Sequence, residues 1–364
     1  MSDTITADGA ARADRLASLL PGRELDALLV TNLVNVRYLT GYTGSNGLAV
    51  VGSDLRRFVT DFRYETQAQE QVHGYERVIG ETDLLDQVLP GLPDGEVRLG
   101  FDDQQVSVRT HKRLRELLPA RVELVPAGGL VEELRLVKDQ HEIERIRAAA
   151  ILADSALTQV LRGGLIGRRE REVALALEHE MQRLGAQKAS FDTIVAHAGH
   201  GALPHASPRD VPIAAGSLVV IDWGAELDGY CSDCTRTYAA GEVDQRAQEI
   251  YELVLEAQLA GLAAIRPGVS GREADAAARD VIVAGGHGDA FGHSLGHGVG
   301  IEVHEAPRLS RASTAVLAAG NVVTDEPGIY LPGVLGVRIE DLVVVTEDGC
   351  DVLSTLPKQL TVVG

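Results

Sequence analysis

Two aspartates, Asp222 and Asp233, lie on the two arms of a predicted β-hairpin and could bind a cation between them. Segment 217–238, SLVVIDWGAELDGYCSDCTRTY, contains two strand-like runs joined by Asp-Gly at 228–229, a pair typical of two-residue hairpin turns. With that loop, Asp222 lies opposite Thr235, and Asp233 falls two residues away on the same face, roughly 7 to 8 Å from Asp222. Carboxylates this close on an apolar hairpin repel each other unless a cation separates them. The shared face therefore favours a metal site over the alternative in which one aspartate faces solvent.

Three histidines and two glutamates follow in segments that suit the same site. His293, His297 and His304 fall within twelve positions and are interleaved with glycines, which let a backbone approach a ligand closely. A single histidine here is more often structural, but three together favour a site. Glu326 ends an apolar run before a Pro-Gly turn, and Glu340 lies inside a predicted strand of apolar residues. Each glutamate, taken alone, could be a salt-bridged core acid.

The combined set of carboxylates with one imidazole is rich in oxygen, which suits manganese or cobalt better than a structural zinc. A divalent cation of this kind lowers the pKa of a bound water molecule and can polarise a carbonyl group. Cys231 and Cys234 form a C-x-x-C pair, but a structural zinc needs a second pair and only Cys350 remains. We interpret that spacing as coincidence. The residues by themselves predict a divalent metal ion, and the family resemblance described below implies two, with manganese preferred and cobalt and zinc as alternatives.

Two predicted domains position these residues. Residues 24–135 alternate short apolar runs (LDALLV, LAVV, RFVT, VRLGF) with helical stretches such as 106–118, the pattern of an α/β layer domain. A long charged amphipathic segment begins at Val137, and we place the boundary just before it. The predicted domains are therefore 1–135 and 136–364.

Helices and strands alternate again in the second domain, so we expect an α/β fold there in the broad sense that includes α+β. Apolar residues at helical spacing, with glycine or proline stops, predict helices at 170–184, 245–265 and 272–284. The strand-like segments between and after these helices contain the candidate ligands. The charged run GRRERE at 167–172 is interpreted as solvated helix rather than as a site.

Composition excludes several classes of protein. At 364 residues the chain exceeds one ordinary core of about 100 to 200 residues, so two domains are expected. The net charge of −19 would repel nucleic acid and anionic membranes, so neither is an expected partner. No stretch approaches the roughly 18 apolar residues of a membrane span, the first residues lack the apolar core of a signal peptide, and three cysteines are few for a disulfide framework. We therefore expect a cytoplasmic protein.

Five segments of the second domain resemble the successive signatures of the pita-bread metallopeptidases, in that family's order. They are FDTIVAHAGHGALPHASPRD (191–210), IDWGAELDGYCSDCTRTY (221–238), GHGVGIEVHEAPRLS (296–310), TDEPGIY (324–330) and GVRIED (336–341). In the first domain, NVRYLTGYTGSNGLAVV (35–51) and VTDFRYETQA (59–68) resemble the amino-terminal domain of prolidases, aminopeptidase P and creatinase. Methionine aminopeptidases lack that domain and creatinase lacks the ligand set. The resemblance therefore implies the prolidase and aminopeptidase P branch, with a creatinase-like domain followed by a pita-bread domain.

The resemblance also implies a role for each matching residue. The implied metal ligands are Asp222, Asp233, His297, Glu326 and Glu340. His205 and His304 are implied as catalytic histidines that do not bind metal and that stabilise the developing oxyanion, and His293 as a further active-site histidine. Glu326 is expected to relay a proton from water to the leaving nitrogen. Asp325 departs from the family pattern, which has an apolar residue there; on a strand it should point away from the metals.

The implied substrate is a peptide with proline in second position. The walls of a pocket for the proline ring would be Phe191, His205, His293 and His304. Arg338 would orient ligands or bind substrate, and the alternative is a salt bridge to a ligand carboxylate. Arg308, in HEAPRLS, is the candidate cation for the free carboxylate of a dipeptide, and the alternative is a surface arginine on a loop.

We therefore predict a metal-dependent Xaa-Pro dipeptidase, a prediction that the compact length and the HEAPRLS segment favour. One alternative is aminopeptidase P, which releases the first residue from longer Xaa-Pro peptides. Another is a catalytically silent binding protein of the same fold, against which the complete ligand set argues. The resemblance also suggests a homodimer.

Overall fold

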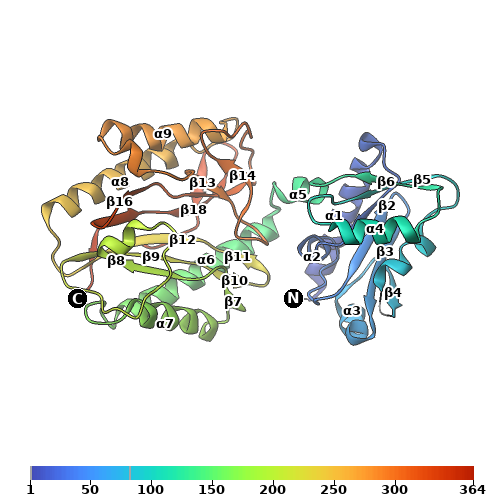
Figure 1. Ribbon diagram of the computed structural model, residues 1–364, viewed down its shortest axis with the longest axis horizontal. Helices are drawn as coiled ribbons and strands as arrows, with labels where there is room; N and C mark the ends of the chain where they lie inside the picture. The colour runs from blue at the N-terminus through green and yellow to red at the C-terminus, as the bar shows by residue number, and fades with distance from the viewer. Residues whose placement is uncertain (1, 82) are drawn as a thin grey trace. The chain divides into compact units, whose positions relative to one another are not determined.

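The apolar runs of residues 24–135 form the central sheet of the first of two units. The computed structural model describes residues 2–81 and 83–364, and the chain divides into the units Met1–Arg135 and Leu136–Gly364 (Figure 1). The strands of the first unit are β1 (Ala27–Val30), β2 (Leu48–Gly52), β3 (Arg56–Asp61), β4 (Glu76–Gly80), β5 (Val97–Phe101) and β6 (Val122–Pro126). The four runs predicted as strands are confirmed as β1, β2, β3 and β5.

The sheet of the first unit is mixed, with the strand order β4-β3-β2-β1-β5-β6. Antiparallel pairs join β1 to β2 and β2 to β3, whereas β3–β4, β1–β5 and β5–β6 are parallel. A parallel pair needs a crossover connection, which α3 and α4 supply between β3 and β4 and between β5 and β6. The helices of this unit are α1 (Ser2–Leu19), α2 (Leu33–Thr40), α3 (Glu65–Gln71), α4 (Val108–Leu117) and α5 (Leu130–Arg135), with the short 3₁₀ helices η1 (Pro21–Arg23), η2 (Phe62–Tyr64), η3 (Leu84–Gln87) and η4 (Leu89–Gly91).

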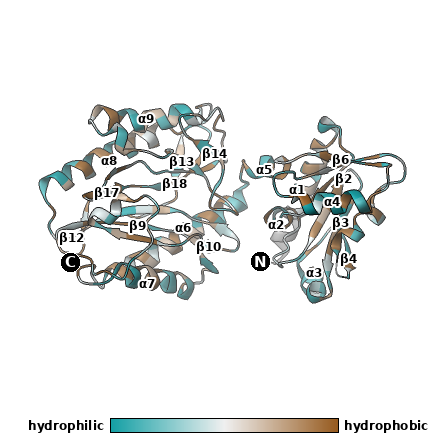
Figure 2. Cartoon of the chain, in the orientation of Figure 1, coloured by the Kyte–Doolittle hydropathy of each residue, from teal (hydrophilic) through white to brown (hydrophobic). Residues whose placement is uncertain are grey.

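Two helix pairs enclose the strands of the second unit from opposite sides (Figure 1). They are α6 (Gln140–Leu161) with α7 (Glu170–Arg183), and α8 (Gln245–Ala264) with α9 (Gly271–Ala284); the 3₁₀ helices are η5 (Ala198–Ala202) and η6 (Gly288–Ala290). The helices predicted from periodicity are confirmed to within one residue at each end for α7, α8 and α9. In Figure 2 the apolar residues gather on the strands and on the helix faces toward them. Each helix pair packs on its own hydrophobic cluster, so the strands lie between two cores.

The strands of the second unit form four sheets. Their orders are β20-β12-β9-β8, β14-β13-β15-β18-β19, β11-β10-β7 and β16-β17. The strands are β7 (Lys188–Ala189), β8 (Ile194–His197), β9 (Ser217–Trp223), β10 (Ala225–Leu227), β11 (Tyr230–Cys231), β12 (Cys234–Ala240), β13 (Gly296–Gly298), β14 (Glu305–Leu309), β15 (Val322–Asp325), β16 (Gly328–Leu331), β17 (Leu335–Arg338), β18 (Asp341–Val345), β19 (Cys350–Val352) and β20 (Thr361–Val362). Both units mix helices with sheets, which confirms the predicted α/β class. Among the described residues, no helix is both long and apolar enough to span a membrane.

The hairpin that contains the two aspartates has the predicted register. Asp222 of β9 lies opposite Thr235 of β12, and β10 and β11 continue the same register to the turn. Asp228 and Gly229 both have positive φ, at 50° and 79°, as a type I′ turn requires. At Gly224 the hairpin passes from one sheet to another, and a Cβ there would lie 2.0 Å from the carbonyl oxygen of Ser232. The backbones of the two hairpin arms are therefore in close contact at this point, directly beside Asp233.

Three candidate ligands lie where the chain leaves one sheet for another. Asp233 directly precedes β12, and Glu326 lies between β15 and β16. Glu340 lies between β17 and β18, so the prediction that it sits inside a strand is wrong. The reason is that β17 pairs with β16 whereas β18 pairs with β15, so the chain must turn between them. At the break, the Glu340 backbone N–H donates to the carbonyl oxygen of Thr235 at 3.0 Å.

The 3₁₀ helix η5 packs on the β16–β17 hairpin backbone to backbone. A Cβ on Gly336 would lie 1.8 Å from the carbonyl oxygen of Gly201, and one on Gly199 would lie 2.7 Å from Gly333. Real Cβ atoms are not accommodated at such distances without movement of the backbone. Glycine is therefore required at this contact, which fixes the start of the loop between η5 and β9.

Gly336→Ala should destabilise the protein by about 1 to 3 kcal/mol, because the added methyl group overpacks a backbone contact that cannot relax cheaply. The matched control is Gly349→Ala, since the nearest atom to its Cβ is Thr346 Oγ1 at 4.0 Å. Urea unfolding of both variants measures the difference. Equal stabilities for the two variants would contradict the steric explanation.

Candidate active site

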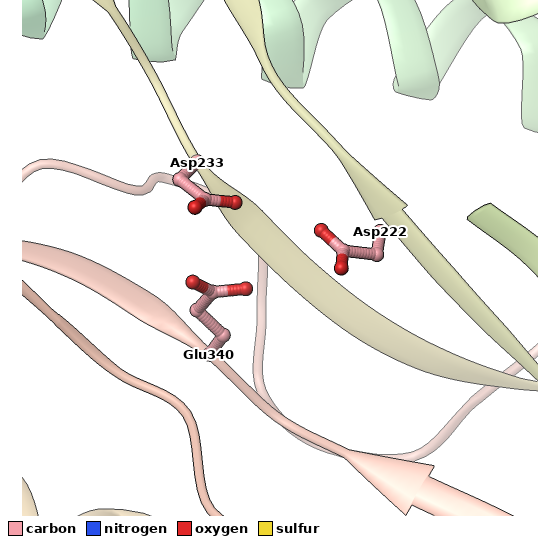
Figure 3. Close-up of side chains that lie close together, drawn as sticks. All are labelled: Asp222, Asp233 and Glu340. Atoms are coloured by element: carbon pink, nitrogen blue, oxygen red, sulfur yellow. The ribbon is translucent and has the colours of Figure 1, made fainter. Parts of the chain in front are cut away.

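Three buried carboxylates converge in the second unit. One ligand atom from each of Asp222, Asp233 and Glu340 lies within 4.8 Å of the other two, and Figure 3 shows the side chains pointing toward one another. Glu340 Oε2 accepts a hydrogen bond from Thr235 Oγ1 at 2.7 Å, and Asp222 Oδ2 accepts one from Arg338 Nη2. Asp222 Oδ1 is buried without a partner among the described residues. The hairpin and the break after β17 thus bring together acids that are distant in sequence.

Electrostatic repulsion perturbs this cluster. Burial, and then the neighbouring carboxylates, raise the pKa of Asp233 and of Glu340 well above the ordinary range. Burial also raises the pKa of Glu326 to about 7, although the charge of Arg338 opposes the shift. A shift of this sign means that ionised carboxylates are unfavourable here unless positive charge is added.

His297 presents an unprotonated nitrogen to the same carboxylates. Its Nδ1 lies 3.1 Å from the carbonyl oxygen of Gly298, which can only accept, so Nδ1 holds the proton. Burial lowers the pKa of His297 to about 4, so the ring is neutral near pH 7 and its Nε2 holds a lone pair. That Nε2 lies 3.3 Å from Glu326 Oε1 and 3.6 Å from Asp233 Oδ2. When both carboxyl groups are ionised, three acceptor atoms face one another here, and a divalent cation between them would relieve the repulsion, so these residues fit a divalent metal.

A cavity of about 670 Å³ opens onto this cluster and is lined by every site residue singled out in the sequence. Besides the acids and His297, its walls include Phe191, His205, His293, His304, Arg308 and Arg338. These side chains come from loops and strands spread over 191–340 of the chain. The fold therefore gathers the predicted residues around one space large enough for a small peptide.

His293 is held by a chain of hydrogen bonds that runs back to Arg338. Its Nδ1 donates to the carbonyl oxygen of Ser294 at 2.8 Å, and its Nε2 accepts from the Tyr330 hydroxyl at 2.9 Å. Arg338 Nη1 in turn donates to that hydroxyl at 2.8 Å. Burial and the charge of Arg338 lower the pKa of His293 to about 4, so the ring is neutral. With both nitrogens occupied, His293 presents its ring to the cavity.

Tyr330 is a residue that the sequence analysis missed, and strand pairing could have found it. Gly328 pairs with Arg338 in the β16–β17 hairpin, so Tyr330 is the diagonal neighbour of Arg338 on the same face. Arg338 itself is buried, and its Nε donates to Thr235 Oγ1 at 2.9 Å. Together with its bond to Asp222, these contacts match the alternative in which Arg338 is tied to a ligand carboxylate.

His205 and His304 differ from the other two histidines because they are exposed to the cavity. Within residues 2–81 and 83–364, neither side chain makes a hydrogen bond, and both line the cavity. The ring of His304 packs against that of His297 with centroids 4.4 Å apart. Both therefore have nitrogens available for a ligand.

Asp325 points away from the carboxylate cluster, as expected from strand alternation. Its Oδ2 accepts from Gln258 Nε2 of α8 at 3.2 Å, and the same Nε2 lies 2.9 Å from Asp341 Oδ2. Burial and the neighbouring Asp341 raise the pKa of Asp325 well above its usual range. Lys358 donates to Asp341 Oδ2 at 2.7 Å and so adds a compensating charge. This acid therefore belongs to the packing under α8.

Asp233→Asn should stabilise the metal-free protein and remove the response to metal. A carboxyl whose folded-state pKa is raised binds more protons in the folded state, so stability falls as pH rises from the ordinary carboxyl range toward the raised value. The variant, lacking that group, should exceed the wild type in melting temperature more at pH 8 than at pH 5. Added Mn²⁺ should raise the melting temperature of the wild type only.

The control for this substitution is Asp192→Asn, an exposed acid that lines the same cavity. It should respond to pH and to Mn²⁺ as the wild type does. Equal stabilisation of wild type and Asp233→Asn by the metal would contradict the placement of Asp233 beside a cation. Melting curves in the presence of a chelator and of Mn²⁺ provide the comparison.

Comparison with known proteins agrees with this geometry. The profile described as Metallopeptidase family M24 matches residues 144–347, and the one described as Creatinase/Prolidase N-terminal domain matches 12–137. The Bacillus subtilis protein named uncharacterized peptidase YqhT is 44% identical over 352 residues, covering 96% of this chain and 99% of its own.

Solved structures give the same result over both domains. A Xaa-Pro dipeptidase from Bacillus anthracis superposes with a TM-score of 0.93 at 41% identity, covering 97% of this chain and 99% of that one. An X-Pro aminopeptidase from Thermotoga maritima gives a TM-score of 0.90 at 35% identity, covering 96% of this chain and 100% of that one. These matches show that this chain belongs to metallopeptidase family M24, which implies divalent metal ions, as a prolidase-like peptidase with a creatinase/prolidase amino-terminal domain.

Proposed function

We propose that this protein is a Xaa-Pro dipeptidase that works with two divalent metal ions, manganese before cobalt or zinc. The ligands in this proposal are Asp222, Asp233, His297, Glu326 and Glu340. The observation that supports the metal assignment most directly is the neutral His297 Nε2 facing two carboxylate oxygens at 3.3 and 3.6 Å. A donor set of four carboxylates with one imidazole suits manganese. The complete set also argues against a catalytically silent protein.

The metal ions, when bound, would supply a lowered pKa for the attacking water and polarisation of the scissile carbonyl. Glu326 is the group proposed to move the proton, because it lines the cavity and a carboxylate among the ligands would lie closest to the attacking water. Thr324 Oγ1 donates to Glu326 Oε1 at 3.1 Å, which leaves Oε2 to exchange the proton with water and with the leaving nitrogen. His205 and His304, with unengaged nitrogens, would donate to the developing oxyanion and to the substrate backbone.

Recognition of proline is proposed to use rings rather than hydrogen bonds. The bond before proline is a tertiary amide without an N–H, so its pocket needs apolar walls and no acceptor. The ring of His293 has both nitrogens engaged, and it packs edge-on against Phe291 with centroids 5.1 Å apart. Phe191 adds a further apolar wall to the same cavity. We therefore assign His293 to the pocket wall rather than to proton transfer.

Arg308 supports a dipeptidase over an enzyme for longer peptides. It lies on β14 opposite His297 of β13, and its side chain lines the cavity. In the described part of the chain its guanidinium makes no ion pair or hydrogen bond. An unpaired guanidinium close to the ligands is suited to the free carboxylate of a dipeptide's proline.

Aminopeptidase P activity is the second candidate, and one observation favours it. A neighbouring cavity of about 410 Å³ shares His293 and Ser294 with the first, and its walls include Ser310 and Arg311. The third residue of a longer peptide could extend in that direction. The likeness to an X-Pro aminopeptidase structure is compatible with this alternative. Substrate length therefore decides between the two.

We further propose that the protein is a cytoplasmic homodimer. Its proposed substrate is a Xaa-Pro peptide, and we expect it to bind neither nucleic acid nor membranes. The net charge of −19 supports the exclusion of polyanionic partners. The dimer follows from the family resemblance, and sedimentation of the metal-loaded protein would measure it.

His205→Ala and His304→Ala should each keep both metal ions yet lose roughly 100-fold or more in kcat, as expected when a transition-state hydrogen bond is removed. Metal content by elemental analysis, beside kcat and KM for a Xaa-Pro dipeptide, separates the two effects. Loss of metal from either variant would show that the histidine is a ligand instead.

Arg308→Ala should raise KM for Xaa-Pro dipeptides more than for Xaa-Pro-Xaa tripeptides, because only the dipeptide presents a carboxylate beside the proline ring. Arg272→Ala is the matched control, an exposed arginine of α9 that is absent from the lining of both cavities. Steady-state kinetics on a substrate-length series provides the measurement. Equal effects of Arg308→Ala on both substrates, or faster wild-type cleavage of tripeptides, would favour aminopeptidase P.

A further inference from the structure

Glu170 is the centre of a buried charged cluster outside the proposed ligand set. The pattern at 167–172 predicts solvated helix, and for Glu170 that prediction is wrong, because its side chain is 0% exposed at the first position of α7. Its carboxylate contacts His197, His200 and Arg209. An ionised carboxylate is buried at high cost unless its oxygens are fully hydrogen-bonded, so these partners explain its position.

The two oxygens of Glu170 hold two distant points of the chain. Oε1 accepts the backbone N–H of His197 at 3.0 Å and its Nδ1 at 2.7 Å. Oε2 accepts the backbone N–H of Arg209 at 2.9 Å and its Nε at 3.1 Å. His200 Nδ1 lies 3.0 Å from Oε2. Burial alone would raise the pKa of Glu170, but the bonds from Arg209 and His197 outweigh it and lower the value to about 2, so the group is ionised at neutral pH.

The segment between these two points is the one that contains His205. Segment 197–209 includes η5 and then Pro204, His205 and neighbouring residues that line the active-site cavity. Between its ends, η5 packs on the β16–β17 hairpin, and Arg338 Nη1 donates to the carbonyl oxygen of Pro204 at 3.2 Å. Because the His205 ring makes no hydrogen bond among the described residues, the backbone of this segment sets its place. A loop whose ends are joined is held more closely than one joined only in the middle.

A similar arrangement exists on α9. The buried pair Asp275–Arg279 contacts the segment that contains His293: Arg279 donates to the carbonyl oxygens of Phe291 and His293, at 2.7 Å each. Asp275 Oδ1 accepts the backbone N–H of Leu295 at 3.0 Å. In each helix pair, buried charged side chains thus form hydrogen bonds with the backbone of one loop that contains a histidine of the cavity.

We propose that Glu170 is a positioning residue, which fixes His205 in the cavity by joining the two ends of segment 197–209. The kinetic part of this inference rests on the proposed function of His205, whereas the structural part does not. Glu170 touches neither the cavity nor the ligand carboxylates, so its effect on turnover must pass through the segment.

Glu170→Gln is the sharpest change, because an amide has one acceptor oxygen where the carboxylate has two. Either orientation of the glutamine directs its NH₂ at a backbone N–H and so breaks the side-chain bond to His197 or to Arg209, which leaves that end of the segment held only by its backbone pairing. We expect kcat for a Xaa-Pro dipeptide to fall on the order of 10- to 100-fold, with a smaller change in KM. In a His205→Ala background, Glu170→Gln should cause no further loss of kcat, since both changes remove the same contribution.

A second measurement needs no turnover. Amide hydrogen exchange of peptides covering 197–209 should accelerate in Glu170→Gln, while exchange of β9 in the same molecule stays unchanged. The control is Asp154→Asn, a buried helix carboxylate that accepts the backbone N–H and hydroxyl of Thr355. Asp154→Asn should leave the hydrogen exchange of 197–209 unchanged. Any effect that it has on kcat should be the same in the wild type and in the His205→Ala background. Arg209→Leu, which alters a half-exposed side chain, should repeat the Glu170→Gln effects more weakly and serves if that variant does not fold.

The outcomes separate this inference from the proposed function. Losses of kcat that multiply in the double variant, or unchanged exchange of 197–209 in both Glu170→Gln and Arg209→Leu, would overturn it. If the wild type cleaves no Xaa-Pro peptide, the proposed function fails, and accelerated exchange confined to 197–209 would still support Glu170 as the residue that holds the segment.

Discussion

Repulsion among buried carboxylates is the constraint on which the second unit depends. Asp222, Asp233 and Glu340 place ligand atoms within 4.8 Å of one another, and the pKa shifts of Asp233 and Glu340 show that neither ionises easily there. A cation relieves this repulsion, which links metal affinity to folding stability. Asp233 and Glu340 lie where the chain turns from one sheet to the next, and a turn can aim a side chain that a regular strand could not.

A layer of hydroxyl and guanidinium groups orients the acids. Thr235 donates to Glu340 and accepts from Arg338, and Arg338 in turn contacts Asp222. Thr324 donates to Glu326 and accepts the backbone N–H of His297 on the neighbouring strand β13. Such partners fix the direction of the carboxylate oxygens, and a site arranged in advance would need less reorganisation to bind a cation.

The loops that contain the histidines are held from outside the cavity. Segment 197–209 is attached to α7 through Glu170, and the segment around His293 is attached to α9 through Arg279. Catalytic groups on loops gain from rigid support, because a loop by itself would sample many positions. Buried charged side chains on α7 and α9 bind the backbone of these loops and so support them, while the His205 ring stays exposed to the cavity.

Local features of this protein could be predicted from its amino-acid sequence. The register of the 217–238 hairpin and the lengths of α7, α8 and α9 follow from turn residues and periodicity, which act over a few neighbouring positions. Types and order of residues also indicated the family and the set that lines the cavity. Three features could be seen only in the folded structure. Glu340 lies between β17 and β18, where the chain passes from one sheet to another, and the Tyr330 hydroxyl links Arg338 to His293. The Glu170 side chain is buried. The reason is physical: each of these depends on partners from remote segments, and periodicity along a single segment carries no information about them.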